Sequence, residues 1–285
     1  MDINVYKVIS EKMSSMSRSQ LKIAQYILKN PNHVPFHNVG ELAKLVEVSD
    51  ATIVRFATFL GFSGYPEFQR HIQTSVQQQL STAERLKLSN QVYGENDQGI
   101  SQIFKEDMGN IQLTMENLDT NSFHQAVEYL LKAKKVYIVA NRSAVALGLF
   151  MHYYLKMMLD HVEIIESVKE NTDLLYDLQS DDLVIGISYT RYTKNTVDIF
   201  SYAKEKGAIT IALTDNLMSP LIQHADVSLT ATSQMPTFID SFVAPLSLIN
   251  ALIIFTGKEK KDDFDHKLNA LEDVWNKFNV FYKNE

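Results

Sequence analysis

The sequence predicts a two-domain protein, in which an all-α domain is followed by an α/β domain with a doubly wound, five-stranded parallel sheet. Three observations lead to this fold class. A chain of 285 residues exceeds the usual size of one domain. Apolar residues recur with helical spacing through the first 80 residues. After residue 135, short β-branched runs alternate with helix-length segments, which is typical of a parallel sheet covered on both faces.

The helical domain centres on residues 39–62, VGELAKLVEVSDATIVRFATFLGF, which divide into two short amphipathic helices. The apolar stripes of these helices consist of Leu42, Ala43 and Val46 in the first, and Ile53, Phe56, Ala57 and Leu60 in the second. The turn between them is Glu47-Val48. The Ser49 hydroxyl is expected to cap the second helix, and Gly61 to end it. The small Ala43 lets the two helices approach closely, as in a helix-turn-helix unit.

The outward face of the second helix carries short side chains and one arginine. These residues are Ser49, Asp50, Ala51, Thr52, Arg55 and Thr58. Such a face fits a DNA major groove, where an arginine can pair with guanine O6 and N7. A helical hairpin inside a larger core would show the same spacing. Glu47 stands where glycine is common in such turns, so we expect slight backbone strain there.

Flanking segments favour DNA binding over a core hairpin. Residues 21–31 predict a preceding amphipathic helix, and residues 61–68 form a turn into another helix. Over residues 3–78 the chain resembles the N-terminal domain of the RpiR/MurR family of bacterial transcription regulators. The most specific part is the pattern S-x-A-T-x-x-R-F-x-x-x-L-G-F, which runs from Ser49 to Phe62. The resemblance implies a double-stranded DNA operator as partner.

Composition limits the remaining possibilities. The chain has no cysteine, which excludes disulfides and thiolate chemistry. It shows no signal peptide and no apolar run of membrane-spanning length, so we expect a cytoplasmic protein without a membrane partner. The net charge is −7, but residues 1–80 carry 8 Lys and Arg against 6 Asp and Glu, whereas the rest carries 19 against 28. A mildly basic N-terminal domain can bind DNA phosphates locally, and two such domains would be needed for firm binding to DNA.

Five short runs predict the strands of the second domain: 136–140, 162–165, 182–188, 208–213 and 226–230. Five strands suit a flavodoxin-like order. Helices are expected at 101–118, 121–133, 240–256 and 263–280. The predicted domains are a DNA-binding domain at 1–80, a linker at 81–104 that is helical at most at its start, and a ligand-binding domain at 105–285.

Two hydroxyl-rich loops follow the first and third predicted strands, where ligands of such sheets bind. Their candidate ligand-binding residues are Asn141, Arg142 and Ser143 in the first, and Ser188, Thr190, Arg191, Tyr192 and Thr193 in the second. Both loops lead into helices, whose N-termini attract anions, and arginine can bind an anion through two hydrogen bonds. The alternative is that the hydroxyls only cap helices and that the arginines are solvated.

Residues 105–257 resemble the SIS (sugar isomerase) domain, which binds phosphosugars. Gly207, Thr214-Asp215, Ser219-Pro220 and Ala225-Asp226 follow that domain's second half. The first loop departs from its G-x-G-x-S pattern, because Ala140 and Arg142 replace the glycines. The second departs from S-x-S-G-x-T, because Thr190 and Arg191 replace the serine and the glycine. The arginines are expected to occupy the anion position themselves or to select a smaller acid.

Asp240 is a third candidate contributor to the ligand site, either as an acid-base residue of an isomerase or as an ordinary cap of the following helix, which we favour. No spacing of His152, His161 or His224 with carboxylates suggests a metal site, and no nucleophile or acid-base pair stands out. We therefore expect no cofactor, no metal and no catalytic residue.

The predicted function is a DNA-binding regulator of metabolism, acting as a homodimer or tetramer, whose operator affinity responds to a small anionic effector, a phosphosugar or a related acid. One alternative is a sugar-phosphate isomerase with a helical accessory domain. Another is an interaction module whose helical head binds protein, although Asp50, Thr52 and Arg55 make that face polar.

Overall fold

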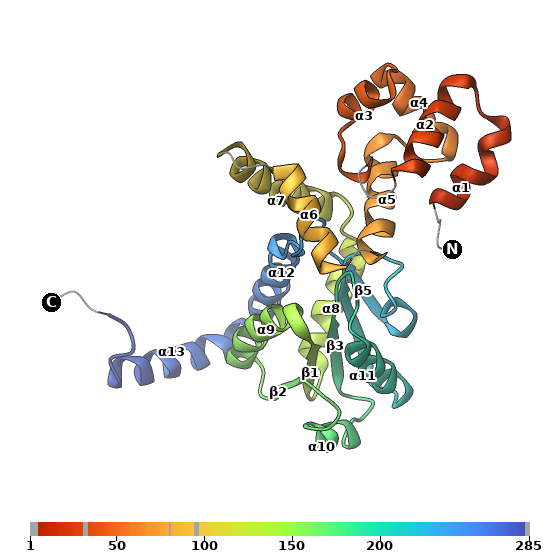
Figure 1. Cartoon of the computed structure of the whole chain (residues 1–285). Coiled ribbons are helices and arrows are strands. Elements are labelled where there is room, and N and C mark those ends of the chain that lie inside the picture. Colours follow the sequence, from red (N-terminus) through yellow and green to blue (C-terminus); the bar gives the residue numbers. More distant parts are fainter. Residues whose placement is uncertain (1–4, 31–33, 80, 94–96, 283–285) are drawn as a thin grey trace. The chain divides into compact units, whose positions relative to one another are not determined.

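The computed structural model describes residues 5–30, 34–79, 81–93 and 97–282 (Figure 1). The chain forms two compact units. One contains the residues up to Glu106 together with Gln234–Asp240, and the other contains Asp107–Ser233 and the residues from Ser241 on. Pro31, expected at the end of a helix, and residues 94–96 of the predicted linker lie outside the described residues. The predicted domain boundaries at residues 80 and 104 stay predictions.

The first unit is helical, as predicted. Its helices are α1 (Val5–Lys12), α2 (Arg18–Lys29), α3 (Val39–Val46), α4 (Asp50–Leu60), α5 (Tyr65–Gln79) and α6 (Thr82–Tyr93). The buried faces of α1 to α5 make one core, in which the stripes of α3 and α4 meet Ile23, Ala24 and Ile27 of α2. The predicted linker is largely helical, since it holds α6 and the start of α7 (Asp97–Glu116). The helix expected from residue 101 therefore begins four residues earlier.

The second unit contains the predicted sheet. Its strands are β1 (Val136–Ala140), β2 (Val162–Ile165), β3 (Leu183–Ile187), β4 (Ile209–Thr214) and β5 (Val227–Thr230). All neighbours are parallel, and the order β2-β1-β3-β4-β5 confirms the doubly wound, flavodoxin-like prediction. The order reverses between β1 and β3, so the loops after these two strands flank the switch point.

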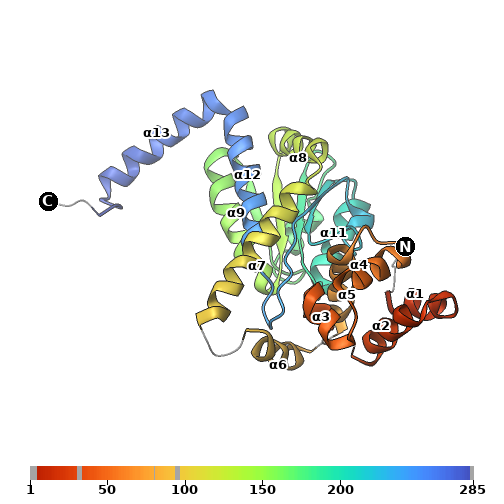
Figure 2. The ribbon, with the colours of Figure 1, turned by 90° about the horizontal axis from the view of Figure 1, so that it is seen from above.

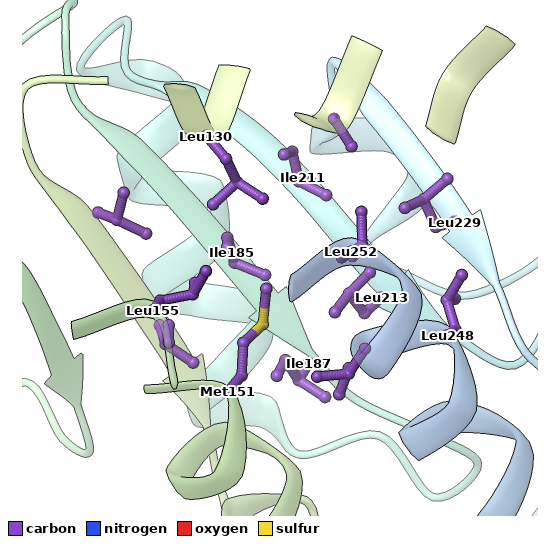
Figure 3. Close-up of a cluster of buried hydrophobic side chains, with 14 of the residues drawn as sticks. Leu130, Met151, Leu155, Ile185, Ile187, Ile211, Leu213, Leu229, Leu248 and Leu252 are labelled. Carbon is purple, nitrogen blue, oxygen red and sulfur yellow. The ribbon is translucent and has the colours of Figure 1, made fainter. Parts of the chain in front are cut away.

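Helices cover both faces of the sheet, as Figures 1 and 2 show. They are α8 (Thr120–Lys132), α9 (Val145–Met158) and α12 (Val243–Glu259) on one face, and α10 (Thr172–Tyr176) and α11 (Lys194–Glu205) on the other. Figure 3 shows the first of these two cores, where leucines of α8, α9 and α12 pack on isoleucines of β3 and β4. The last helix, α13 (Lys261–Lys277), projects away from the sheet (Figure 2).

Close packing of helices on strands explains two glycines. A Cβ atom on Gly186 of β3 would lie 2.6 Å from the ring of Phe200, so only glycine lets α11 approach there. A Cβ atom on Gly148 of α9 would lie 2.9 Å from that of Ala140 at the end of β1. Both contacts fix helices that begin at the loops of the switch point. No helix in the described parts of the chain is long and apolar enough to cross a membrane.

Candidate functional site

The α3–turn–α4 unit has the predicted core. All the stripe residues of both helices are buried, and Val48 N–H closes the turn on Ala43 O at 2.9 Å. Glu47 takes a left-handed conformation with φ of 56°, as expected where glycine is common. Its carboxylate accepts a hydrogen bond from Lys22 Nζ at 2.8 Å, which lowers the pKa of Glu47.

The outward face of α4 is free of packing. Ser49, Asp50, Ala51, Arg55 and Thr58 are exposed, and Thr52 is half-buried. Ser49 does occupy the N-cap position, but the expected side-chain cap is absent, because its hydroxyl pairs with Thr52 Oγ1 at 2.8 Å instead. Arg55 Nη2 donates to the same Thr52 oxygen at 3.3 Å. A polar row of three side chains therefore lies along the face that could meet base edges.

Sequence reasoning missed the residue that holds the far end of α4. Gly61 ends the helix in a left-handed conformation as predicted, with φ of 111°. Lys12 of α1 also donates from Nζ to Phe59 O at 3.2 Å and to Leu60 O at 3.3 Å. A cation at a helix C-terminus interacts favourably with the helix dipole. Only the fold brings Lys12 to this position, 47 residues away in sequence.

The two loops of the switch point start side by side, because Ala140 and Ile187, their preceding residues, are register partners. Each loop contains one arginine with a left-handed backbone, Arg142 with φ of 55° and Arg191 with φ of 65°. These are the positions where the SIS pattern has glycine. The loops thus keep the backbone shape that glycine would give and add a guanidinium to each.

Asn141 ties the first loop to its surroundings. Its Oδ1 accepts hydrogen bonds from Thr196 Oγ1 and Asn195 Nδ2, each at 2.9 Å, and its Nδ2 donates to Glu166 O at 2.6 Å. These contacts join the ends of β1 and β2 to the start of α11. Arg142 and Ser143, by contrast, are exposed. The structure therefore gives Asn141 a positioning role in the loop.

The second loop is held by a buried carboxyl group. Asp215 lies directly after β4, and its carboxylate accepts hydrogen bonds from three hydroxyl groups. The donors are Thr190, Tyr192 (2.8 Å) and Thr214 (3.2 Å). Burial raises the pKa of Asp215, although these hydrogen bonds oppose the rise. Burial likewise raises the pKa of Tyr192. Asp215 was not among the predicted site residues, although it belongs to the Thr-Asp pair that the sequence resemblance singled out.

The helices that follow the loops begin without side-chain caps. Thr193 is the N-cap residue of α11 and Ala144 that of α9, and neither side chain makes a cap hydrogen bond. In the second loop, Thr193 N–H reaches Ser188 Oγ at 3.4 Å. The N-cap side chains therefore do not cap these two helices, although the Ser188 hydroxyl accepts from the N–H group before α11. At α9 the N–H of Val145 donates to carbonyls of the preceding 3-10 turn, Arg142–Ala144. A ligand-binding role for the loop hydroxyls stays a prediction.

Asp240 does not cap α12, and that expectation was wrong. The helix begins at Val243 with Phe242 at the N-cap position. The Asp240 carboxylate instead accepts a hydrogen bond from Arg85 Nη2 of α6 at 2.5 Å. Asp240 belongs to the helical unit, apart from the unit that holds the two loops. Its part in ligand binding stays a prediction.

The histidines have structural surroundings. His152 lies on α9 and contacts Val162 O at 3.1 Å, and His224 contacts Ser201 Oγ at 3.4 Å. Within the described ranges, no group of three or more His, Asp or Glu side chains could hold a metal ion.

A helix-turn-helix unit with an exposed polar outer face, followed along the chain by a unit with a flavodoxin-like sheet, defines a DNA-binding regulator with a second, α/β domain. Family models agree: "Helix-turn-helix domain, rpiR family" matches residues 3–79, and "SIS domain" matches residues 129–255. An HTH-type transcriptional regulator of Caldanaerobacter subterraneus subsp. tengcongensis is 32% identical over 283 residues, covering 95% of this chain and 96% of the relative. The chain belongs to the RpiR family of HTH-type transcriptional regulators with a SIS domain.

Two solved structures share the fold. The sugar isomerase domain of an RpiR transcription factor from Sphaerobacter thermophilus has a TM-score of 0.58 and 26% identity, covering 60% of this chain and 97% of that one. The NanR protein of Vibrio vulnificus, solved in complex with ManNAc-6P, has a TM-score of 0.57 and 19% identity, covering 98% of this chain and all of that one.

Proposed function

We propose that this regulator binds an operator through α4 and that a small anionic metabolite, a phosphosugar or a related acid, changes its affinity for DNA. The observation that carries the proposal is the pair of left-handed arginines, Arg142 and Arg191, at the two loops of the switch point. A left-handed backbone at a non-glycine residue costs about 1–3 kcal/mol and is concentrated at functional sites. Relatives of this chain, HexR of Escherichia coli among them, are named as HTH-type transcriptional regulators, which agrees with the DNA-binding part.

The DNA-reading face is tested at Arg55. The Arg55→Ala variant should bind the operator about 1–3 kcal/mol more weakly and discriminate less among sequences, because it loses a base contact. Arg18→Ala is the matched control, since Arg18 is also exposed but lies on α2. Fluorescence anisotropy at several salt concentrations measures both, because DNA affinity must fall with salt. Equal affinities of the Arg55 variant and the wild type would remove α4 from the interface.

The effector site is tested by a thermal-shift screen of phosphosugars and small organic acids. The positive dipole ends of α9 and α11, which follow the two loops, and the two arginines suit a phosphate or carboxylate. NanR, of the same fold, was solved with a phosphosugar. A ligand at 100 times its Kd stabilises the native state by about 2.7 kcal/mol. The shift should disappear in Arg142→Ala and in Arg191→Ala and persist in the control Lys132→Ala on α8. A shift that both arginine variants retain would contradict the site.

A second copy of the chain is the proposed protein partner. Several helices of the α/β unit carry exposed large apolar side chains, among them Met108, Ile111 and Met115 of α7, Tyr153 of α9, Ile254 of α12 and Val274 of α13. Large exposed apolar patches mark interaction sites, and paired reading heads match two half-sites of an operator. Met108→Glu should lower the mass measured by light scattering to that of a monomer, whereas Leu217→Glu, in the loop after β4, should not. An unchanged mass for the Met108 variant would exclude this face.

An isomerase remains the second candidate, and Asp215 is the observation that favours it. A buried carboxyl group with a raised pKa beside a ligand loop is a possible general acid. Its oxygens, however, already accept hydrogen bonds from Thr190, Tyr192 and Thr214. Turnover of an aldose or ketose phosphate by the purified protein, lost in Asp215→Asn, would establish the enzyme.

A further inference from the structure

The connection between β5 and α12 leaves the α/β unit and returns to it. Residues Gln234–Asp240, here named the β5–α12 loop, pack with the helical unit, whereas Ser233 and Ser241 on either side belong to the α/β unit. The backbone N–H of Ser241 donates to Ser233 O at 3.0 Å and closes the base of this loop. A seven-residue segment of the ligand domain is therefore a part of the DNA-binding unit.

Arg85 of α6 holds the β5–α12 loop through three hydrogen bonds. Its Nε donates to Thr237 O at 2.8 Å, and its Nη2 donates to Ile239 O at 3.1 Å and to Asp240 Oδ1 at 2.5 Å. The Arg85 side chain is 3% exposed and that of Asp240 is 14% exposed. A buried guanidinium needs a full set of partners, and its rigid fork fixes their positions. The loop and α6 must therefore move together or lose this ion pair.

The base of the β5–α12 loop contacts the second loop of the switch point. The two loops of the switch point, residues 141–143 and 188–193, are here named the effector loops. Phe242, two residues after Asp240, has its ring centroid 5.5 Å from that of Tyr189, which follows Ser188. Tyr189 is buried, and its hydroxyl has no hydrogen-bond partner among the described residues. An unpaired buried hydroxyl costs free energy, which a new hydrogen-bond partner would recover. A shift of Tyr189 would press on Phe242.

The base is also anchored from α7. Ser241 Oγ donates to Asp107 Oδ1 at 2.5 Å, and the backbone N–H of Thr232 donates to Thr114 Oγ1 at 2.9 Å. These hydrogen bonds tie the base to α7, so a displacement at Phe242 reaches Asp240 and Ile239, where Arg85 binds, when Ser241 moves with it.

We infer that Arg85 is a positioning residue that couples the effector loops to the DNA-binding unit by holding Asp240. The sequence of contacts runs from Tyr189 to Phe242, along the chain to Asp240, and through the ion pair to Arg85 on α6. The inference rests on the proposed function of the effector loops. The other role for Arg85 is that of a tether, which would stabilise α6 and the β5–α12 loop without affecting residues 188–193.

Hydrogen–deuterium exchange of the full chain separates coupling from tethering. In Arg85→Gln, amides in residues 188–193 and 234–242 should exchange at least about tenfold faster, because a tenfold change corresponds to the loss of one charge-assisted hydrogen bond. Amides of β1 serve as the internal control for global unfolding and should not change. Faster exchange confined to residues 82–93 and 234–240 overturns the inference.

Three further variants keep the test decisive. Arg85→Lys retains the charge but not the fork, and should restore part of the protection of residues 188–193. Arg85→Gln combined with Asp240→Asn removes both charges and should leave residues 188–193 better protected than in Arg85→Gln alone, since no charge is left buried and unpaired. If Arg85→Gln fails to fold, Asp240→Asn alone, which retains a neutral acceptor for Arg85, should still speed exchange at residues 188–193. No change there in any folded variant contradicts the coupling.

Inorganic phosphate is the probe for the effector arm. In the wild type it should slow exchange in residues 188–193 and in α6, whereas in Arg85→Gln it should slow exchange only in residues 188–193. Equal protection of α6 in both proteins overturns the inference. Absence of protection in residues 188–193 of the wild type contradicts the proposed effector site instead, and leaves the variant comparison to decide the role of Arg85.

Discussion

The left-handed backbone at Arg142 allows a prediction whose sign depends on a single dihedral angle. Its φ is 55° and its side chain is exposed, so the stability of variants at this position reports mainly the backbone. The left-handed region costs an L-residue about 1–2 kcal/mol, and glycine avoids this cost. Glycine, however, lowers the free energy of unfolding by about 0.5–1 kcal/mol, because it gives the unfolded chain more conformational freedom. Arg142→Gly should therefore be more stable than Arg142→Ala by about 0.5–1 kcal/mol.

Urea unfolding of the two variants, followed by circular dichroism, measures this difference. Both variants lack the guanidinium, so both should lose anion binding equally, and only the backbone separates them. Ala146, exposed on α9, is the matched control site. Ala146→Gly should be less stable than the wild type by about 1 kcal/mol, because glycine is a poor helix former. If glycine at position 142 is destabilising relative to alanine, as at position 146, then the left-handed loop geometry is refuted.

Three further predictions concern single buried contacts. Burial raises the pKa of Asp215 above its ordinary value of 3.8. Its contribution to the free energy of unfolding is therefore present at low pH and falls as the pH rises from about 4 through the folded-state pKa. Asp215→Asn lacks this loss, so urea unfolding across pH should show the stability of the variant rising relative to that of the wild type, whereas parallel curves would contradict the burial. Lys12→Met removes the cation from the end of α4 and should lower the free energy of unfolding by about 1 kcal/mol in the same assay, with no change if Lys12 is solvated. Ala43→Leu overfills the α3–α4 contact and should cost about 1–3 kcal/mol by thermal denaturation; a neutral result would mean that the two helices are not close-packed there.

The elements that the sequence predicted well are those set by local patterns. The stripe of α4 repeats at helical spacing, and the runs that became β1 and β2 are β-branched and short, so their bounds match the prediction. Gly61 and Glu47 lie where the turn chemistry requires left-handed backbone, and both adopt it. The order of the strands in the sheet could also be predicted, because a chain of alternating strands and helices has few possible parallel topologies.

The features that escaped prediction depend on contacts between distant residues. Arg85 and Asp240 lie 155 residues apart, and nothing near Arg85 marks it as a buried ion-pair partner. The Ser49 hydroxyl could pair either with a backbone N–H group of the first turn of α4 or with the Thr52 hydroxyl. The sequence does not decide between them, and the structure has the pair with Thr52. Asp215 was visible as part of a resemblance, but its hydrogen bonds to Thr190 and Tyr192 require the fold to bring two loops together.

The contact between Gly186 and Phe200 makes the central strand intolerant of change on the side that α11 covers. Even an alanine at position 186 would push the aromatic ring, and with it the whole helix, outward from the sheet. Since Thr193 is the N-cap residue of that helix, the second loop of the switch point would be displaced first. The expected phenotype is a protein that still binds its operator but no longer responds to the proposed effector.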